Sequence, residues 1–243
     1  MLRGEGITKR FGGLTALSSL DFQVREGEIV GLIGPNGSGK TTLFNVISGI
    51  FPPENGQIIF NGQNITGCKP HEIARMGIGR TFQLVKPFEE LSVLDNVAAG
   101  VLYGKGESNA SKARREAQGI LEFVDLPDES DTLASELMLA DRKRLEVARA
   151  LSIGPKLLLL DEVFAGLNKT ELKQAVELVF KIHQEMGVTI FMVAHVMSTI
   201  MNTCERIMVL DFGHKLAEGS PDEVANDPKV IEAYLGEAYA KGR

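Results

Sequence analysis

Cysteine is scarce in this chain of 243 residues, where only Cys68 and Cys204 occur. Two scattered cysteines provide neither a disulfide framework nor a zinc site, so we expect both thiols to be buried. Long apolar runs are also lacking. None approaches the roughly 20 residues that span a bilayer, and the amino-terminal stretch has no apolar segment of signal-peptide length. We therefore expect the chain to remain in the cytoplasm.

Basic residues are outnumbered, with 26 Lys and Arg against 32 Asp and Glu and a net charge of −6. Nucleic-acid binding depends on a concentrated basic face, so this balance argues against a nucleic-acid partner, although a local basic patch stays open. The remaining composition is that of an ordinary soluble globular protein. The length allows one large domain or two smaller ones.

What the sequence does contain is a glycine loop, GPNGSGKTT at residues 34–42, which matches the phosphate-binding template G-x-x-x-x-G-K-[ST]. Glycines let backbone N–H groups surround phosphates, Lys40 reaches the β- and γ-phosphates, and the Thr41 hydroxyl ligates magnesium. The alternative is a glycine-rich turn between two core elements. We predict a site for a nucleoside triphosphate and Mg²⁺ that uses Asn36, Gly37, Ser38, Gly39, Lys40, Thr41 and Thr42.

Hydrophobic spacing around this loop predicts a strand that feeds it and a helix that follows it. Residues 28–33 form a short apolar run, and the residues after Lys40 are apolar at helical spacing. The helix N-terminus would then face the phosphates with its unpaired N–H groups. Alternation in the first thirty residues predicts antiparallel strands, with another strand at 57–60.

The rest of the chain predicts helices and then a buried sheet. Residues 91–151 have mostly helical spacing, whereas the apolar runs at 156–160 and 188–193 are typical of parallel strands covered on both faces. A helix at 170–186 separates these two strands, and a hairpin follows them at 207–217. We predict an α/β fold with a mainly parallel sheet, an antiparallel β subdomain and an inserted helical subdomain.

Polar residues follow the predicted parallel strands, where ligands of such sheets bind. Asp161 is suited to hold magnesium through water, and Glu162 to act as the base for the water that attacks the γ-phosphate. His195 would hydrogen-bond a γ-phosphate oxygen, and Gln83 would ligate the metal or orient the water. The alternatives are two solvated acids at a strand end, a structural histidine and a surface glutamine.

In their order and separation, these motifs resemble the ATP-binding subunits of ABC transporters over essentially the whole chain. The segments that carry the resemblance are GPNGSGKTT, Gln83 after Thr81-Phe82, RKRLEVARAL from Arg142, LLLLDE, AGLN at 165–168, and His195. The resemblance implies a P-loop NTPase core with helices on both sheet faces. Residues 1–84 and 152–243 would form the ATP-binding core with its antiparallel subdomain, and 85–151 the helical subdomain.

More narrowly, the chain is similar to the ATP-binding subunits of branched-chain amino acid importers, although importers of urea or other amides look alike. The segments involved are TKRFGG, TLFNVISG, IGRTFQ, AGLN and the tail VIEAYLG. This resemblance implies an ATPase with ATP and Mg²⁺ as cofactors, and Phe11 stacked on adenine. It also implies integral-membrane permease subunits as partners, a solute-binding protein indirectly, and a peripheral location on the inner face of the cell membrane. The segment at 88–94 would belong to the docking groove for the permease.

The family's signature motif, usually LSGGQ, is altered to LMLAD at residues 137–141. Met138 replaces the serine, Leu139 and Ala140 replace both glycines, and Asp141 brings a negative charge toward an anionic ligand. We interpret Asp141 as a helix cap. The chain thus combines a complete glycine loop with an altered signature. This asymmetry predicts that the chain pairs with a non-identical ATP-binding subunit, which supplies an intact signature to the glycine loop of this chain.

Two other functions share the same nucleotide site. One is a soluble ATPase that acts on nucleic acid or ribosomes, and the other is a nucleotide-sensing subunit that binds ATP but barely hydrolyses it. The single cassette and the acidic charge argue against the first. The retained Glu162 and His195 argue against the second.

Overall fold

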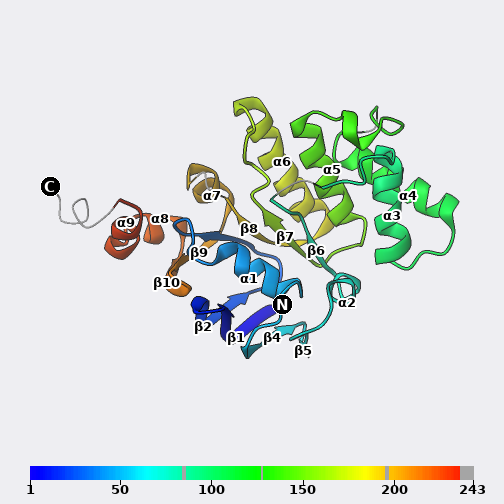
Figure 1. Ribbon diagram of the computed structural model, residues 1–243. Coiled ribbons are helices and arrows are strands. Elements are labelled where there is room, and N and C mark those ends of the chain that lie inside the picture. Colours follow the sequence, from blue (N-terminus) through cyan, green and yellow to red (C-terminus); the bar gives the residue numbers. More distant parts are fainter. Residues whose placement is uncertain (84–85, 127, 195–196, 236–243) are drawn as a thin grey trace. The chain divides into compact units, whose positions relative to one another are not determined.

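The protein is described by a computed structural model that covers residues 1–83, 86–126, 128–194 and 197–235 (Figure 1). It divides into two compact units, one made of Met1–Ile73 with Thr189–Arg243 and the other of Ala74–Val188. The helical segment expected at 85–151 lies within the second unit, together with strands and a helix that the sequence assigns to the core.

The first unit contains an antiparallel sheet and a mainly parallel one, as predicted. The antiparallel sheet has the strand order β2-β1-β4-β5. In the other sheet β8 and β9 flank β3 in parallel, and β10 pairs with β9 as an antiparallel hairpin. The strands are β1 (Leu2–Phe11), β2 (Leu14–Val24), β3 (Ile29–Ile33), β4 (Asn55–Phe60), β5 (Gln63–Asn64), β8 (Thr189–Val193), β9 (Arg206–Asp211) and β10 (His214–Gly219).

A hydrophobic core holds the first helix, α1 (Lys40–Ile47), against these strands. Every residue of β3 and β8 is buried, which is why both segments are continuously apolar in the sequence. The Phe191 ring of β8 lies 5.1 Å from the Phe44 ring of α1 and 6.4 Å from the Phe22 ring of β2, between ring centroids. The unit's other helices are α7 (Met197–Thr203), α8 (Pro221–Ala225) and α9 (Pro228–Leu235).

The second unit combines a short parallel strand pair with helices. The strands β6 (Ile78–Arg80) and β7 (Leu157–Asp161) pair in parallel. The predicted helical stretch is confirmed as three helices that contact one another and are drawn in green in Figure 1. The helices of this unit are α3 (Val93–Gly104), α4 (Ala110–Phe123), α5 (Leu139–Leu151) and α6 (Lys169–Met186), with a short 3₁₀ turn at Ala134–Glu136, while α2 (Pro70–Arg75) spans the boundary between the units in the sequence.

The two cysteines differ in burial. Cys204 is buried as expected, and burial raises the pKa of its thiol to about 12. The expectation is wrong for Cys68, which is only partly buried because it lies in a turn ahead of α2, and such connections run over the surface. Within the described part of the chain, no helix is both long enough and apolar enough to cross a membrane.

Candidate active site

The glycine loop follows β3 and folds back tightly on neighbouring main chain. Gly34 and Gly39 have φ angles of 154° and 108°. A Cβ atom on Gly34 would lie 2.1 Å from the Leu210 carbonyl oxygen, and one on Gly39 would lie 2.6 Å from that of Ala16. Both positions therefore require glycine, because any other residue would combine strain with a clash against backbone.

The helix α1 begins at Lys40, directly after the loop. Its N-cap is Gly39 in the left-handed conformation, and no described side chain forms a capping hydrogen bond there. The Lys40 side chain is buried, and its Nζ donates to the carbonyl oxygens of Gly34 at 2.8 Å and Pro35 at 2.9 Å. An ammonium group and the N-terminus of a helix thus converge on one loop, which suits a phosphate chain.

The turn between β9 and β10 is joined to the glycine loop by a main-chain hydrogen bond. The Gly213 N–H donates to the Ser38 carbonyl oxygen at 2.9 Å, and the Gly213 carbonyl accepts from the Ser18 N–H at 3.0 Å. Phe212 beside it is 82% exposed and has a φ of 41°. Main-chain hydrogen bonds therefore hold the phosphate loop, independently of which side chain stands at position 212.

Phe11, predicted to stack on adenine, is the last residue of β1. Its side chain is 43% exposed at the tip of the β1–β2 hairpin, where it lies opposite Leu14. Part of the aromatic surface is therefore open to a planar ligand, as stacking requires.

In the second unit, Asp161 ends β7 and forms a buried ion pair. Its Oδ2 lies 2.9 Å from Arg80 Nη2, and the two side chains are 1% and 6% exposed. The Asp161 N–H also donates to Thr81 Oγ1 at 3.0 Å, and the Arg80 guanidinium lies 4.9 Å from the centroid of the Phe82 ring. Asp161 is thus not a solvated acid at a strand end, and the segment before Gln83 fixes its orientation.

Glu162 follows at a sharp bend of the chain. Its φ of 54° is unusual for a residue other than glycine, and the residue is 6% exposed. Gln83 Nε2 donates to Glu162 Oε2 at 2.8 Å, and Lys143 Nζ donates to the Glu162 carbonyl oxygen at 3.0 Å. The structure therefore brings together the proposed base and the proposed water-orienting amide, and excludes the solvated alternative for Glu162 as well.

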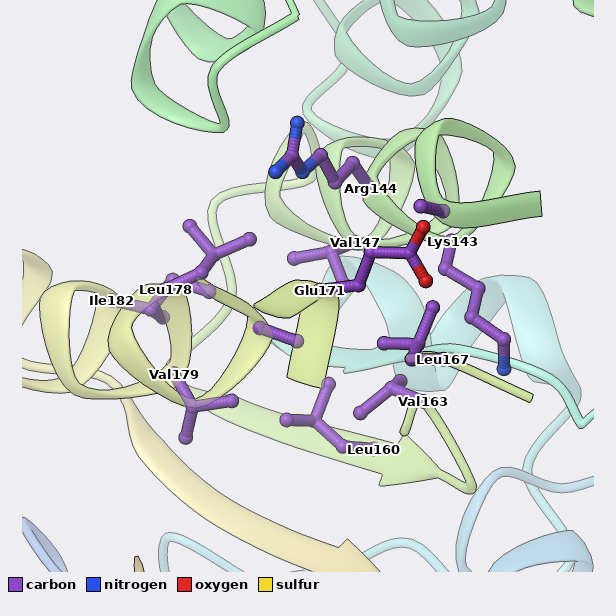
Figure 2. Close-up of a pocket in the computed structure, with 12 residues that line it drawn as sticks. Lys143, Arg144, Val147, Leu160, Val163, Leu167, Glu171, Leu178, Val179 and Ile182 are labelled. Carbon is purple, nitrogen blue, oxygen red and sulfur yellow. The ribbon is translucent and has the colours of Figure 1, made fainter. Parts of the chain in front are cut away.

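The lysine that contacts Glu162 extends from α5 beside an apolar pocket. In Figure 2, Lys143 and Arg144 leave α5 in different directions, while Val147 faces the side of α6 that carries Leu178. Burial lowers the pKa of Lys143, and the carboxylates of Glu162 and Glu146 oppose that shift. Most of the pocket lining is aliphatic, which does not suit a triphosphate.

The altered signature stretch corrects one prediction. The helix α5 begins at Leu139 with Met138 as its N-cap and no side-chain cap bond, so Asp141 is not the cap. Asp141 lies in the first turn, where it pairs with Arg144 at 3.5 Å and still interacts favourably with the helix dipole. The helix starts earlier than expected because leucine and alanine, unlike the glycines of the usual motif, favour helix. Met138 and Leu139 are 76% and 48% exposed.

The predicted site residues divide between the two units. The glycine loop and Phe11 belong to the first, whereas Gln83, Asp161 and Glu162 belong to the second; His195 lies outside the described residues. Sequence reasoning missed Arg80 and Lys143. For Arg80 the available signal was a basic residue at the end of a short apolar strand, since a buried charge requires a partner; Lys143 gave no such signal because it lies within the helix α5.

Comparison with known proteins identifies the family to which the chain is similar. A family model described as ABC transporter matches residues 17–165, and one described as branched-chain amino acid ATP-binding cassette transporter matches residues 214–240. The high-affinity branched-chain amino acid transport ATP-binding protein LivG of Salmonella typhimurium is 39% identical over 98% of both chains.

Solved structures with the same fold include a nucleotide-free ATP-binding cassette from an ABC transporter. It is 34% identical with a TM-score of 0.89, over 98% of this chain and 99% of that one. A cassette in its ADP conformation is 33% identical with a TM-score of 0.86, over 98% of this chain and 99% of that one.

Proposed function

Because this chain belongs to the ATP-binding family of ABC transporters and is an ATPase, we propose that it powers an importer of branched-chain amino acids or related small polar solutes. The support for the solute class is the match at residues 214–240 and the likeness to LivG. The observation that carries hydrolysis is the hydrogen bond from Gln83 to the buried Glu162, because it pairs an orienting amide with a carboxylate base.

In this proposal the phosphate chain of ATP binds to residues 36–42, with Lys40 on the β- and γ-phosphates. Thr41, Gln83 and Asp161 would hold Mg²⁺. Their hydroxyl, amide and carboxylate oxygens are hard donors of the kind that Mg²⁺ prefers, and it completes its shell with phosphate and water. The metal would neutralise charge on the transferring phosphate, Glu162 would accept the proton of the attacking water, and His195 would bind a γ-phosphate oxygen.

Lys40→Ala tests the nucleotide site. The variant removes a charge-assisted contact to phosphate, so we expect ATP affinity to fall at least about tenfold. Titration of a fluorescent ATP analogue against the isolated chain measures this. Lys173→Ala is the matched control, because Lys173 is 78% exposed and pairs only loosely with Glu177 at 3.7 Å. Equal affinities of Lys40→Ala and wild type would contradict the proposal.

The permease is proposed to dock on the loop that precedes α3. One buried amide holds this loop: Asn96 Nδ2 donates to the carbonyl oxygens of Phe88, Leu91 and Ser92, and Asn96 Oδ1 accepts from the Phe88 N–H at 2.8 Å. Phe88 and Leu91 remain 52% and 41% exposed. A rigid loop that presents apolar side chains is suited to a helix of a membrane subunit, and this contact would hold the chain at the inner face of the membrane. The solute-binding protein would act on this chain only through the permease.

The second ATP-binding subunit is proposed to be a different chain. The exposed Met138 and Leu139 replace the serine and glycine of the usual signature, so this α5 offers no hydroxyl to a partner's γ-phosphate. A partner with an intact signature would complete the glycine loop of this chain, whereas the other composite site would hydrolyse weakly.

Lysine variants of the two subunits test this asymmetry in the assembled transporter. Lys40→Ala in this chain removes the site with the intact signature, so it should lower turnover at least about tenfold more than the equivalent change in the partner. The readout is ATP turnover with one wild-type subunit present each time. Equal losses from the two variants would contradict a non-identical pair.

A further inference from the structure

The ring of Phe11 is held in place by a second aromatic ring from a different segment. Phe11 and Phe51 pack edge to face, with centroids 5.3 Å apart and an interplanar angle of 79°. The Lys9 ammonium lies 5.3 Å from the Phe11 centroid and 5.9 Å from that of Phe51. Aromatic pairs of this geometry and cation–π contacts both stabilise ring orientation. Phe11 is therefore a supported ring at the hairpin tip.

Hydrogen bonds fasten the segment that carries Phe51 to β1. Lys9 Nζ donates to the Pro52 carbonyl oxygen at 2.9 Å and to Glu54 Oε1 at 2.7 Å. The Arg10 N–H donates to Glu54 Oε2 at 2.7 Å, and the Glu54 N–H donates to the Thr8 carbonyl oxygen at 2.9 Å. Charge-assisted bonds of this kind are the stronger class of hydrogen bond. Residues 51–54, which we call the support loop, are thus tied to the strand that ends in Phe11.

The support loop is also continuous with the helix that begins at the phosphate loop. The N–H groups of Ile50 and Phe51 both donate to the Asn45 carbonyl oxygen near the end of α1, at 2.9 and 3.3 Å. The first residue of α1 is Lys40, and the other end of the helix is hydrogen-bonded to the segment whose Phe51 ring packs on Phe11. The spacing between the phosphate loop and the Phe11 ring is therefore set inside one compact unit.

We propose that Phe51 and the Lys9–Glu54 pair are positioning residues for recognition of the adenine base. The inference rests on the proposed function, in which adenine stacks on Phe11. Stacking depends on the orientation of the ring, and a phenylalanine at a hairpin tip without support loses that orientation. The support loop thus sets how much of the binding free energy comes from the base rather than from the phosphates.

The experiment compares ATP with inorganic tripolyphosphate, which carries the phosphates without the base. Both are measured as competitors of a fluorescent ATP analogue on the full chain, with Mg²⁺ at fixed ionic strength. For Phe51→Leu we expect ATP affinity to fall about tenfold and tripolyphosphate affinity to stay within about twofold. Phe51→Tyr keeps the ring and should bind ATP within about twofold of wild type. Phe11→Leu/Phe51→Leu should lose no more than Phe11→Leu alone.

A matched control is Phe123→Leu, because the Phe123 ring also lies under a lysine, with Lys181 Nζ 4.4 Å from its centroid. It should leave both affinities unchanged. If Phe51→Leu lost affinity for ATP and for tripolyphosphate equally, Phe51 would be a structural residue of the phosphate loop and the inference would be overturned. Unchanged ATP affinity in Phe51→Leu would also overturn the inference.

Failure of the proposed function looks different, since wild type itself would then not bind ATP, or Phe11→Leu would bind it normally. If Phe51→Leu does not fold, Glu54→Gln carries the same comparison, because it releases the support loop without removing a ring. It should weaken ATP about threefold and leave tripolyphosphate unaffected; equal effects on the two ligands would overturn the inference.

Discussion

Replacing Glu162 by glutamine is expected to lower ATP turnover by about 10²- to 10⁴-fold while ATP binding stays close to wild type. The substitution keeps size and shape but removes the ability to accept a proton. In the wild-type chain Gln83 Nε2 donates to Glu162 Oε2 at 2.8 Å. The amide oxygen of the new glutamine can accept the same hydrogen bond, so the local geometry should persist. The main-chain contact to Lys143 does not depend on the side chain at all.

Turnover is measured in the assembled transporter, and binding is measured on the isolated chain. Closed dimers should accumulate with ATP, since hydrolysis no longer reopens them, and size-exclusion chromatography detects them. Glu177→Gln is the control, because that carboxylate is 63% exposed on α6 and should leave turnover unchanged. Undiminished steady-state hydrolysis in Glu162→Gln would remove Glu162 from its role as the base.

Arg80→Met is expected to lower the free energy of unfolding by about 3–5 kcal/mol. The guanidinium that is lost offsets the charge of the Asp161 carboxylate in a pair whose side chains are 6% and 1% exposed. Burial lowers the pKa of Arg80, and the Asp161 carboxylate acts against that shift. The charged form of the guanidinium is therefore stabilised by the carboxylate beside it. Removal of one partner from such a pair therefore costs far more than the pair contributes as a whole.

Urea denaturation of the isolated chain, followed by circular dichroism, measures this loss. Arg80→Met/Asp161→Asn removes both charges and should recover at least about half of it. Arg144→Met breaks a pair at 3.5 Å whose side chains are 25% and 31% exposed, and it should cost less than about 1 kcal/mol. A loss in Arg80→Met as small as that of Arg144→Met would show that the buried pair contributes little.

The sequence predicts those parts of the fold that depend on local patterns. The apolar runs at 28–33 and 188–193 become buried parallel strands because continuous hydrophobicity requires two covered faces. The glycine loop is equally local, since its template fixes the spacing from Gly34 to the start of α1.

Features that depend on distant pairing could not be predicted in this way. Arg80 and Asp161 are 81 positions apart, and no spacing rule places one beside the other. The contact of Phe11 with Phe51 likewise arises only when the support loop folds against β1. The start of α5 differs from the prediction because aspartate is a favoured N-cap residue, whereas the helical backbone already begins at Leu139.

The main-chain attachment of the phosphate loop has a consequence for how this protein tolerates mutation over evolutionary time. Peptide groups are common to all residue types, so the bond from the Gly213 N–H to Ser38 needs no particular side chain at Phe212, although the φ of 41° there disfavours β-branched residues. Gly213 has no such freedom, since a Cβ there would lie 2.7 Å from the Ala16 carbonyl oxygen. A position that accepts varied side chains thus lies directly beside one that requires glycine, and substitution of a reporter side chain at 212 would place a probe next to the nucleotide loop without changing the main-chain hydrogen bonds of that loop.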